Sequence, residues 1–194
     1  MRVILWSLNI LVLLTLSLFA KDNIIAQFNH WFLSTNTQTV SNIEVVFSPN
    51  QGATDAIIKA ISEARKLVLV SAYSFTSQTI AQALLDAKKR NVDVKIILDK
   101  SQVSQRYSSS KFFENLNFDL KIDVKHAIYH NKVMIIDDKT IITGSFNFTK
   151  AAESKNAENV LIIRDNPKLA QLYKQDWLKH WNNAVAIDKY SLKK

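Results

Sequence analysis

The stretch "YHNKVMIIDDKTIITGSFNFT", residues 129–149, contains two apolar runs separated by a short polar segment. This pattern predicts an antiparallel β-hairpin. With the turn at Asp138-Lys139, Asp137 pairs with Thr140 and the register of the whole hairpin follows. Two polar pairs then lie beyond the apolar runs: Lys132 opposite Ser145, and His130 opposite Asn147. Directly opposed residues share one face of a hairpin, so we expect these four side chains to converge on one patch.

The predicted patch has the chemistry of a phosphate site. Lys132 offers a positive charge with three donors, while Ser145 and Asn147 offer neutral donors. Such groups suit phosphate oxygens whose negative charge grows during transfer. His130 can act as a nucleophile or a general acid near neutral pH. Asp137 has the opposite parity, so on a regular strand it faces away and serves as a structural acceptor.

A structural interpretation of the same residues stays open. A lysine in a strand is commonly a solvated charge at a sheet edge, and a single histidine commonly has no catalytic role. Around the patch the sequence shows no cluster of carboxylates that would hold Mg²⁺. The chain also has no cysteine, which excludes disulfides, thiol chemistry and cysteine-ligated zinc.

The segments around the hairpin alternate between strand and helix patterns. Predicted strands cover residues 43–47, 66–75, 92–99, 119–126 and 158–165, and predicted helices begin at Thr54, at Ser77 and at Asn166-Pro167. This alternation predicts an α/β fold with a mixed, largely parallel sheet and helices on both faces. The polar segment 100–111, which contains Arg106, reads as a solvated connection, with an exposed ligand-binding loop as the alternative. Tyr173, Trp177 and Trp181 are expected to pack in a core or an interface.

The first twenty residues, "MRVILWSLNILVLLTLSLFA", form an apolar run after Arg2. They predict an export signal, and an uncleaved membrane anchor is the open alternative. The remaining chain then divides into a juxtamembrane linker, residues 21–42, and one domain, residues 43–194. We expect that domain to work in the periplasm or at a membrane, facing outside the cytoplasm. The net charge of +8 favours a polyanionic partner.

Two motifs in the hairpin resemble those of the phospholipase D superfamily. "HNKVMIID" matches the pattern H-x-K-x4-D, and "GSFN" matches its G-S-x-N continuation. Glu158 in "NAEN" occupies the position of the acidic residue that orients the histidine in this family. "SAYSFTS", residues 71–77, is similar to an early strand of the small bacterial nucleases in the superfamily, and the resemblance begins near Ile43.

The resemblance implies a phosphodiesterase that works through a covalent phosphohistidine without a metal or other cofactor. It implies a catalytic set of His130, Lys132, Asp137 and Glu158, with Lys132, Ser145 and Asn147 holding the phosphate. Displacement through histidine needs a second acid–base group, and this chain carries one motif copy. We therefore expect a twofold homodimer in which His130 of each subunit reaches a shared site.

Three functions remain open on this evidence. The first is a nuclease that cleaves DNA or RNA, with single strands favoured, because a basic surface can follow a polyphosphate backbone. The second is a phospholipase D acting on phosphatidyl headgroups at the membrane, although the polar segment around Arg106 argues against an apolar entry surface. The third is a non-catalytic nucleic-acid-binding protein on the same scaffold.

Overall fold

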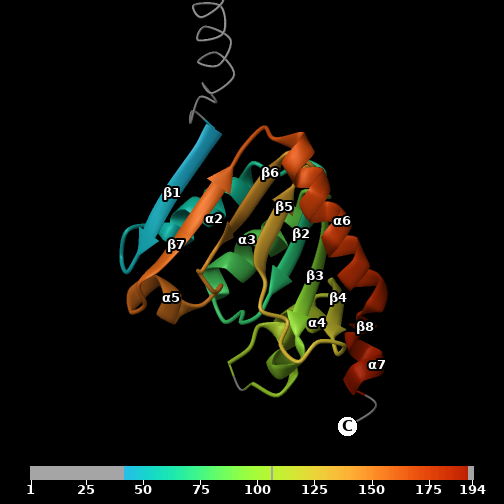
Figure 1. Ribbon diagram of the computed structural model, residues 1–194. Coiled ribbons are helices and arrows are strands. Elements are labelled where there is room, and N and C mark those ends of the chain that lie inside the picture. Colours follow the sequence, from blue (N-terminus) through green and yellow to red (C-terminus); the bar gives the residue numbers. More distant parts are fainter. Residues whose placement is uncertain (1–41, 106, 192–194) are drawn as a thin grey trace, which may run out of the picture. The chain divides into compact units, whose positions relative to one another are not determined.

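A computed structural model describes residues 42–105 and 107–191 of the chain (Figure 1). The predicted export signal, all but the last residue of the linker, and Arg106 lie outside these residues. Within them, no helix combines the length and apolar character that crossing a bilayer requires.

The described residues are organised around one sheet of eight strands. Its strands, from one edge to the other, are β1 (Ile43–Ser48), β7 (Glu158–Ile163), β6 (Thr140–Gly144), β5 (Lys132–Ile136), β2 (Leu67–Ala72), β3 (Asp93–Asp99), β4 (Asp119–Asp123) and β8 (Val185–Ala186). The predicted mixed sheet is confirmed, but "largely parallel" is wrong. Only β2–β3 and β3–β4 pair in parallel, whereas the other five neighbouring pairs are antiparallel. Parallel pairing needs long crossovers, and the chain supplies these only in its first half.

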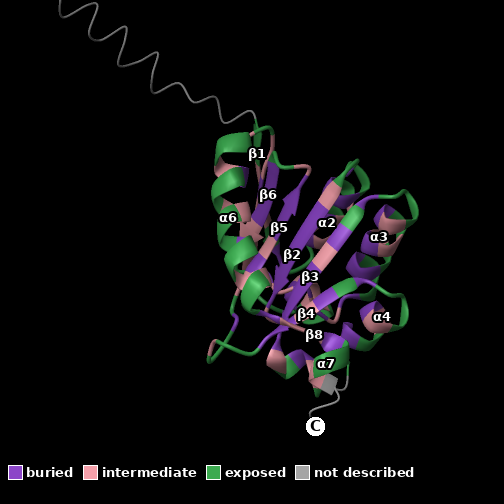
Figure 2. Ribbon diagram, turned by 90° about the vertical axis from the view of Figure 1, so that its right-hand side faces the viewer, coloured by how far each residue is buried: buried purple, intermediate pink, exposed green. Residues whose placement is uncertain are grey.

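Helices cover both faces of the sheet, as predicted. They are α2 (Ala53–Ser62), α3 (Gln78–Lys89), the 3₁₀ helix η2 (Lys100–Val103), α4 (Ser110–Asn115), α5 (Lys150–Ser154), α6 (Pro167–Asn183) and α7 (Ile187–Ser191). The strands are largely buried, while the outer surfaces of the helices are exposed (Figure 2).

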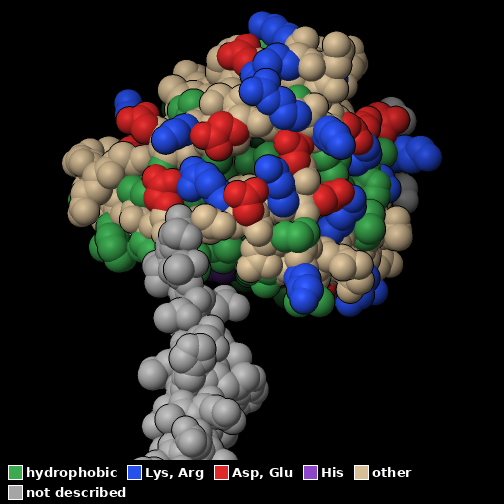
Figure 3. Space-filling model, turned by 90° about the horizontal axis from the view of Figure 1, so that it is seen from above, with side chains coloured by type: hydrophobic (Ala, Val, Ile, Leu, Met, Phe, Trp, Pro, Cys, Tyr) green, Lys and Arg blue, Asp and Glu red, His purple; other side chains and the backbone are tan. Residues whose placement is uncertain are grey.

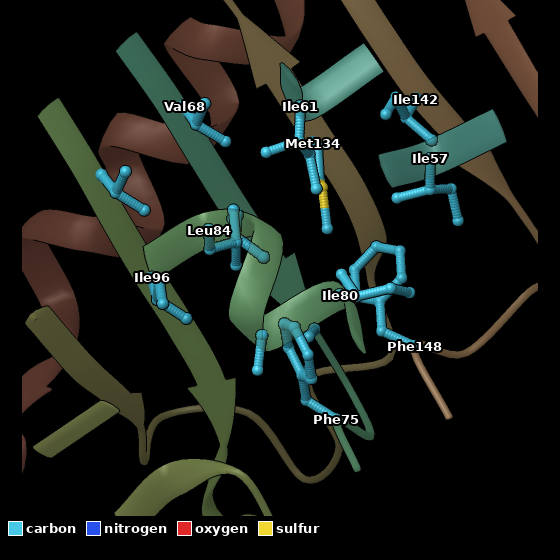
Figure 4. Close-up of a cluster of buried hydrophobic side chains, with 14 of the residues drawn as sticks. Ile57, Ile61, Val68, Phe75, Ile80, Leu84, Ile96, Met134, Ile142 and Phe148 are labelled. Atoms are coloured by element: carbon cyan, nitrogen blue, oxygen red, sulfur yellow. The ribbon is translucent and has the colours of Figure 1, made fainter. Parts of the chain in front are cut away.

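The larger core lies between the sheet and helices α2 and α3. Figure 4 shows Ile61 of α2 beside Met134 and Ile57 of α2 beside Ile142, while Leu84 of α3 lies near Ile96. On the opposite face, the buried indole of Trp177 in α6 donates from Nε1 to the Val70 carbonyl at 3.1 Å. The Trp181 ring stacks on Trp177 with centroids 4.8 Å apart. Trp177 and Trp181 are therefore packing residues, as the sequence predicts.

The predicted starts of two helices are confirmed, and the predicted cap of a third is wrong. Ser77 Oγ accepts from the Ile80 amide at the start of α3, and Asn166 Oδ1 accepts from the Leu169 amide at the start of α6. The predicted Thr54 cap of α2 is wrong. The N-cap of α2 is Gly52, and the carboxylate that accepts from the Thr54 amide, at 2.7 Å, comes from Glu153 of α5. A distant acidic side chain therefore satisfies the first turn of this helix.

The polar segment 100–111 also departs from its predicted role as a solvated connection. It contains η2 and the beginning of α4, and the side chain of Gln102 is buried. Gln102 Oε1 accepts from the Phe75 amide at 3.0 Å, and its carbonyl accepts from Ser110 Oγ at 3.0 Å. These polar side chains pair with backbone groups that would otherwise be buried without partners.

The hairpin forms, but its predicted register is wrong by one residue. Ile136 pairs with Thr140, so the turn has three residues, Asp137, Asp138 and Lys139. Asp137 and Asp138 both have positive φ, 51° and 57°, a conformation that aspartate tolerates better than most residues. Extending the observed pairing places Lys132 opposite Gly144 and not Ser145. His130 correspondingly falls opposite Phe146 and not Asn147.

Candidate active site

The site residues lie at the ends of four neighbouring strands, β2, β5, β6 and β7. We call this row of strand ends the open edge of the sheet. Lys132 begins β5 and pairs with Ala72, the last residue of β2. Gly144 ends β6 and pairs with Val160, close to Glu158, which begins β7. Ligand sites of α/β sheets lie beyond strand ends, and this edge has that position.

Lys132 and Glu158 lie on the same face of this edge. Met134 follows Lys132 by two residues on β5, and Val160 follows Glu158 by two residues on β7. Both belong to the core under α2 and α3. Because side chains alternate along a strand, Lys132 and Glu158 share that face, with Gly144 on the strand between them. Burial lowers the pKa of Lys132 from its usual value, and the charge of Glu158 partly opposes that shift. The lysine is thus a partly desolvated cation beside one carboxylate.

Gly144 changes the direction of the chain at the end of β6. Its φ is +147°, and a Cβ here would collide with the Asn159 carbonyl oxygen. The amides of Ser145 and Phe146 both donate to that same oxygen, at 3.2 and 3.3 Å. Two residues opposite one define a β-bulge. The bulge, and not the regular pairing predicted from the sequence, brings the "GSFN" segment around the sheet edge.

The Ser145 hydroxyl is held with its proton free. Ser145 Oγ accepts from the Asn159 amide at 3.1 Å and from Asn159 Nδ2 at 3.3 Å. Both contacts use oxygen lone pairs, so the O–H remains available as a donor. Ser145 is exposed, which allows that donor to reach a ligand oxygen.

His130 is exposed and contacts both Lys132 and Tyr73. Lys132 Nζ donates to the His130 carbonyl at 2.9 Å, which leaves two of its three protons for a ligand. The Tyr73 ring lies 4.6 Å from the imidazole centroid and 5.2 Å from Lys132 Nζ. Sequence reasoning assigned no role to Tyr73, although an aromatic residue directly after a buried strand within residues 71–77 was a usable signal.

The residue before His130 anchors the backbone of the site. Tyr129 is buried, its hydroxyl lies 2.6 Å from Ser71 Oγ, and its amide donates to Asp99 Oδ2 at 2.7 Å. Burial raises the pKa of Tyr129 to about 12. The phenol therefore stays protonated at neutral pH and acts as a structural hydrogen-bonding group.

Asn147 carries an unusual feature for a side chain at a sheet edge. Its Oδ1 atom is buried and has no hydrogen-bond partner among residues 42–105 and 107–191. Buried polar atoms are nearly always paired in folded proteins, so this unpaired oxygen indicates a missing hydrogen-bond donor or a functional constraint.

Asp137 is not brought to this site. It follows β5 at the end opposite Lys132, and its carboxylate accepts from the amides of Arg65, Lys66 and Leu67 at 2.7–2.9 Å. Burial acts to raise the pKa of Asp137, but these three donors and the charge of Lys139 outweigh it and hold the pKa below its usual value. These contacts agree with the structural role that the strand parity of Asp137 predicts, and its position gives no support to the catalytic role, which stays a prediction.

Glu158 lies at the site, but its predicted contact with His130 is not formed in the part of the chain that the structure describes. Its Oε1 accepts from Asn156 Nδ2 at 3.2 Å, and its amide donates to Ser48 Oγ at 3.2 Å. Its orienting role stays a prediction. Among residues 42–105 and 107–191, the side chains that could together hold a metal ion are Asp123, His126 and His180.

A polar groove of about 790 Å³ opens beside the starts of α2, α3 and α5. Thr54, Thr76, Ser77 and Lys150 are among its lining residues. Thr76 and Ser77 lie in the same 71–77 segment as Tyr73, and their amides donate to the Phe148 carbonyl. The groove is thus built on the segments that flank the His130 site, and it offers hydroxyl and ammonium groups.

Comparisons with known proteins identify the family of this chain. Residues 57–181 match the family described as cardiolipin synthase, PLD-like domain. A phospholipase D of Rickettsia prowazekii is 41% identical over 162 residues, which is 84% of this chain and 78% of the relative. The structure of Nuc from Salmonella typhimurium, a phospholipase D family member, is 41% identical with a TM-score of 0.71 over 74% of this chain and 96% of Nuc. NucT from Helicobacter pylori is 27% identical with a TM-score of 0.63 over 74% and 99%. The chain belongs to the phospholipase D superfamily.

Proposed function

We propose that this protein is a metal-independent endonuclease that hydrolyses phosphodiester bonds of DNA or RNA, with single strands favoured. The observation that carries the proposal is the set of strand ends where exposed His130 lies beside the buried Lys132 and a Ser145 hydroxyl with a free proton. One nucleophile surrounded by cationic and neutral donors suits attack on a phosphate diester.

In the first step, a ring nitrogen of His130 attacks phosphorus and the bond to the leaving oxygen breaks. Lys132 and Ser145 donate to the non-bridging oxygens as their charge grows. The leaving oxygen takes a proton from a second acid. Water then attacks the phosphohistidine and gives a proton to the second group, which lost its own in the first step; the P–N bond breaks, the imidazole returns, and one product keeps a phosphate monoester.

The second acid is the reason to propose a homodimer. Of the other histidines in the described residues, His126 pairs with Asp123 and His180 with Asp176. Asp123 belongs to β4, which is separated from β5 by β2 and β3. A twofold partner placed against this edge would supply His130 of the partner subunit as the acid. The exposure of His130 is compatible with such a contact.

Three observations support a nucleic-acid substrate. The chain is strongly basic, with a net charge of +8. The groove built on the flanking segments is lined by hydroxyl groups, Lys150 and Glu153, and this polar lining suits a polar polymer better than acyl chains. Two similar solved structures carry the names Nuc and NucT.

A phospholipase D acting on phosphatidyl headgroups is the second candidate. The similarity to the Rickettsia proteins named phospholipase D favours it. Both functions use the same phosphate chemistry, so the fold does not separate them. We also propose that residues 1–20 direct the protein out of the cytoplasm or anchor it in a membrane.

A substrate panel tests the proposed activity. Purified protein with chelator present is offered labelled single-stranded DNA, RNA and phosphatidylcholine vesicles, with His130→Ala as the matched control. We expect cleavage of nucleic acid by the wild type and none by the variant. Cleavage of lipid alone would overturn the nuclease proposal in favour of the second candidate.

A mixed dimer tests the shared site. Wild-type and His130→Ala subunits carrying different affinity tags are co-expressed, and the heterodimer is purified through both tags. A site that needs both histidines leaves the heterodimer nearly inactive. Half of the wild-type activity per dimer would refute the shared site and leave the nuclease activity itself untouched.

A further inference from the structure

Asp123, His126 and His180 form a cluster outside the proposed phosphate site. Asp123 ends β4, His126 follows three residues later in the loop to β5, and His180 lies in the last turn of α6. Each offers one potential ligand atom, and these atoms all lie within 4.8 Å of one another. The C-terminal part of α6 lies beside β4 and β8, which explains how residues so far apart in sequence meet (Figure 1).

The spacing of the ligand atoms suits a small metal ion. Asp123 Oδ2 lies 2.9 Å from His126 Nδ1 and 4.0 Å from His180 Nδ1. In a tetrahedral zinc site with bonds of about 2.0–2.1 Å, neighbouring ligand atoms lie about 3.3 Å apart. The two observed distances bracket that value, so small side-chain rotations would complete the geometry.

Asp176 fixes which nitrogen of His180 is free. It precedes His180 by one turn of α6, and its Oδ2 lies 3.3 Å from His180 Nε2. Donation from Nε2–H to Asp176 leaves the lone pair of Nδ1 directed toward Asp123. Histidine ligands of metals commonly donate their second N–H to a carboxylate in this way, which orients the ring.

The buried negative charge of Asp123 also favours a bound cation. The Asp123 side chain is completely buried, and its hydrogen-bond partners among the described residues are the amide and ring of His126. A buried carboxylate is costly unless it is paired or coordinates a metal. The His180 imidazole faces the Asp123 carboxylate at 4.0 Å, beyond hydrogen-bond distance. A cation bound between the His126 and His180 rings would compensate the negative charge of Asp123.

We propose that Asp123, His126 and His180 bind a divalent transition-metal ion, with Zn²⁺ the best fit. Two imidazoles and one carboxylate suit Zn²⁺ and disfavour Mg²⁺ and Ca²⁺, which prefer oxygen ligands alone. The His126 side chain is 41% exposed, so a fourth position is open to water.

The metal would act on the position of the catalytic segment. His126 lies four residues before His130, and the Tyr129 ring contacts the His180 ring with centroids 5.1 Å apart. A bound ion would join this loop to α6, and it would stabilise the fold because it binds the native state. Asp123 on β4 lies about 14 Å from β5, across three strand spacings. We therefore assign the ion a structural role and no catalytic step. The proposal therefore goes beyond the proposed function and holds for either substrate.

Calorimetric titration of the chelator-stripped, dialysed protein with ZnCl₂ tests this site, with MgCl₂ as the comparison ion. We expect one Zn²⁺ per chain, a higher Tm in Zn²⁺, and no effect of Mg²⁺. His126→Gln and His180→Gln should each weaken Zn²⁺ binding at least about tenfold, and Asp176→Asn by about tenfold. The exposed imidazole of His130 provides the control, since His130→Ala should keep the full Zn²⁺ affinity and stoichiometry.

The result that overturns the proposal is wild-type protein that binds no Zn²⁺, or binding that survives both histidine substitutions. Circular dichroism of each variant checks folding, and the exposed His126 position gives a variant that does not disturb α6. Because the readout is metal binding, its outcome is independent of whether DNA, RNA or lipid is cleaved.

Discussion

The two ends of strand β5 carry the polar residues of one motif, yet they are built differently. At the turn end, the Asp137 carboxylate is paired with three backbone amides. Acidic and basic side chains are interspersed on that face of the molecule (Figure 3). Ion pairs there join Lys139 to Asp165, Lys174 to Asp138, and Arg164 to Glu44 and Glu63. At the open end, His130 is exposed, the Ser145 proton is free and Asn147 Oδ1 has no partner among the described residues.

This difference separates residues that maintain the fold from residues that await a ligand. A group that the protein satisfies internally has little capacity left for a substrate, and its loss is felt as stability. A group left unpaired contributes little to the folded state, and its loss is felt as activity. Sequence spacing alone does not distinguish the structural residues at one end of the motif from the ligand-binding residues at the other.

Replacing His130 should have the largest effect on activity. His130→Ala removes the nucleophile, so we expect kcat to fall by at least about 10³-fold. The side chain is exposed, and its removal should change the free energy of unfolding by less than about 0.5 kcal/mol. Single-turnover cleavage and urea denaturation of the same preparation measure both. Substantial residual turnover would mean that another group attacks phosphorus.

Asn147→Ala should come second. Loss of one preorganised donor or orienting group at a phosphate site costs about 10²-fold in kcat. Because Oδ1 has no partner among the described residues, stability should stay the same or rise slightly. The same two assays apply. A large loss of stability with unchanged kcat would place Asn147 with the structural residues of the turn end and break the contrast between the two ends.

Asp137→Asn should show the opposite pattern, with activity per folded molecule nearly unchanged. An amide has one acceptor oxygen in place of two, so we expect a loss of about 1–3 kcal/mol in unfolding free energy. The neighbouring Asp138→Asn is the matched control, because Asp138 is exposed and pairs only with Lys174 within the described residues. It should cost less than about 1 kcal/mol.

The pH dependence of that loss has a definite sign. The pKa of Asp137 is held below its usual value in the folded state, so its carboxylate stabilises the protein above about pH 4. As the pH falls through the folded-state pKa, this contribution disappears. The difference between wild type and Asp137→Asn should therefore be full at neutral pH and shrink in acid, and a difference that grows in acid would contradict this account.

Much of the fold could be predicted because each signal was local. The hydrophobic runs of β2 and β3 and the helix starts at Ser77 and at Asn166-Pro167 all depend on residues close in sequence. The Thr54 cap failed because Glu153, about a hundred positions away, supplies the carboxylate. The parallel character of the sheet was overestimated, since strand direction depends on how the second half of the chain returns.

The sequence indicated which side chains come together, but not how the backbone brings them to one place. His130, Lys132, Ser145 and Glu158 do reach one sheet edge, yet the assumed two-residue turn gave a register wrong by one. The bulge after Gly144 brings "GSFN" around the edge, and its signal was a glycine at the end of a strand. Tyr73 was missed because its contact with His130 joins segments more than fifty residues apart.

The smallest predicted effect concerns the charge pair at the open end. Burial lowers the pKa of Lys132, and Glu158 partly restores it, so Glu158→Gln should move the Lys132 pKa further down. Nitrogen NMR of labelled lysine follows this titration directly, and the alkaline fall of kcat/KM should shift to lower pH in parallel. Asp138→Asn, at the other end of β5, is the control and should leave the Lys132 titration in place. An upward shift of the Lys132 pKa in Glu158→Gln would mean that Glu158 acts on Lys132 mainly by burying it. The open end would then be stabilised by contacts within the protein, as the turn end is.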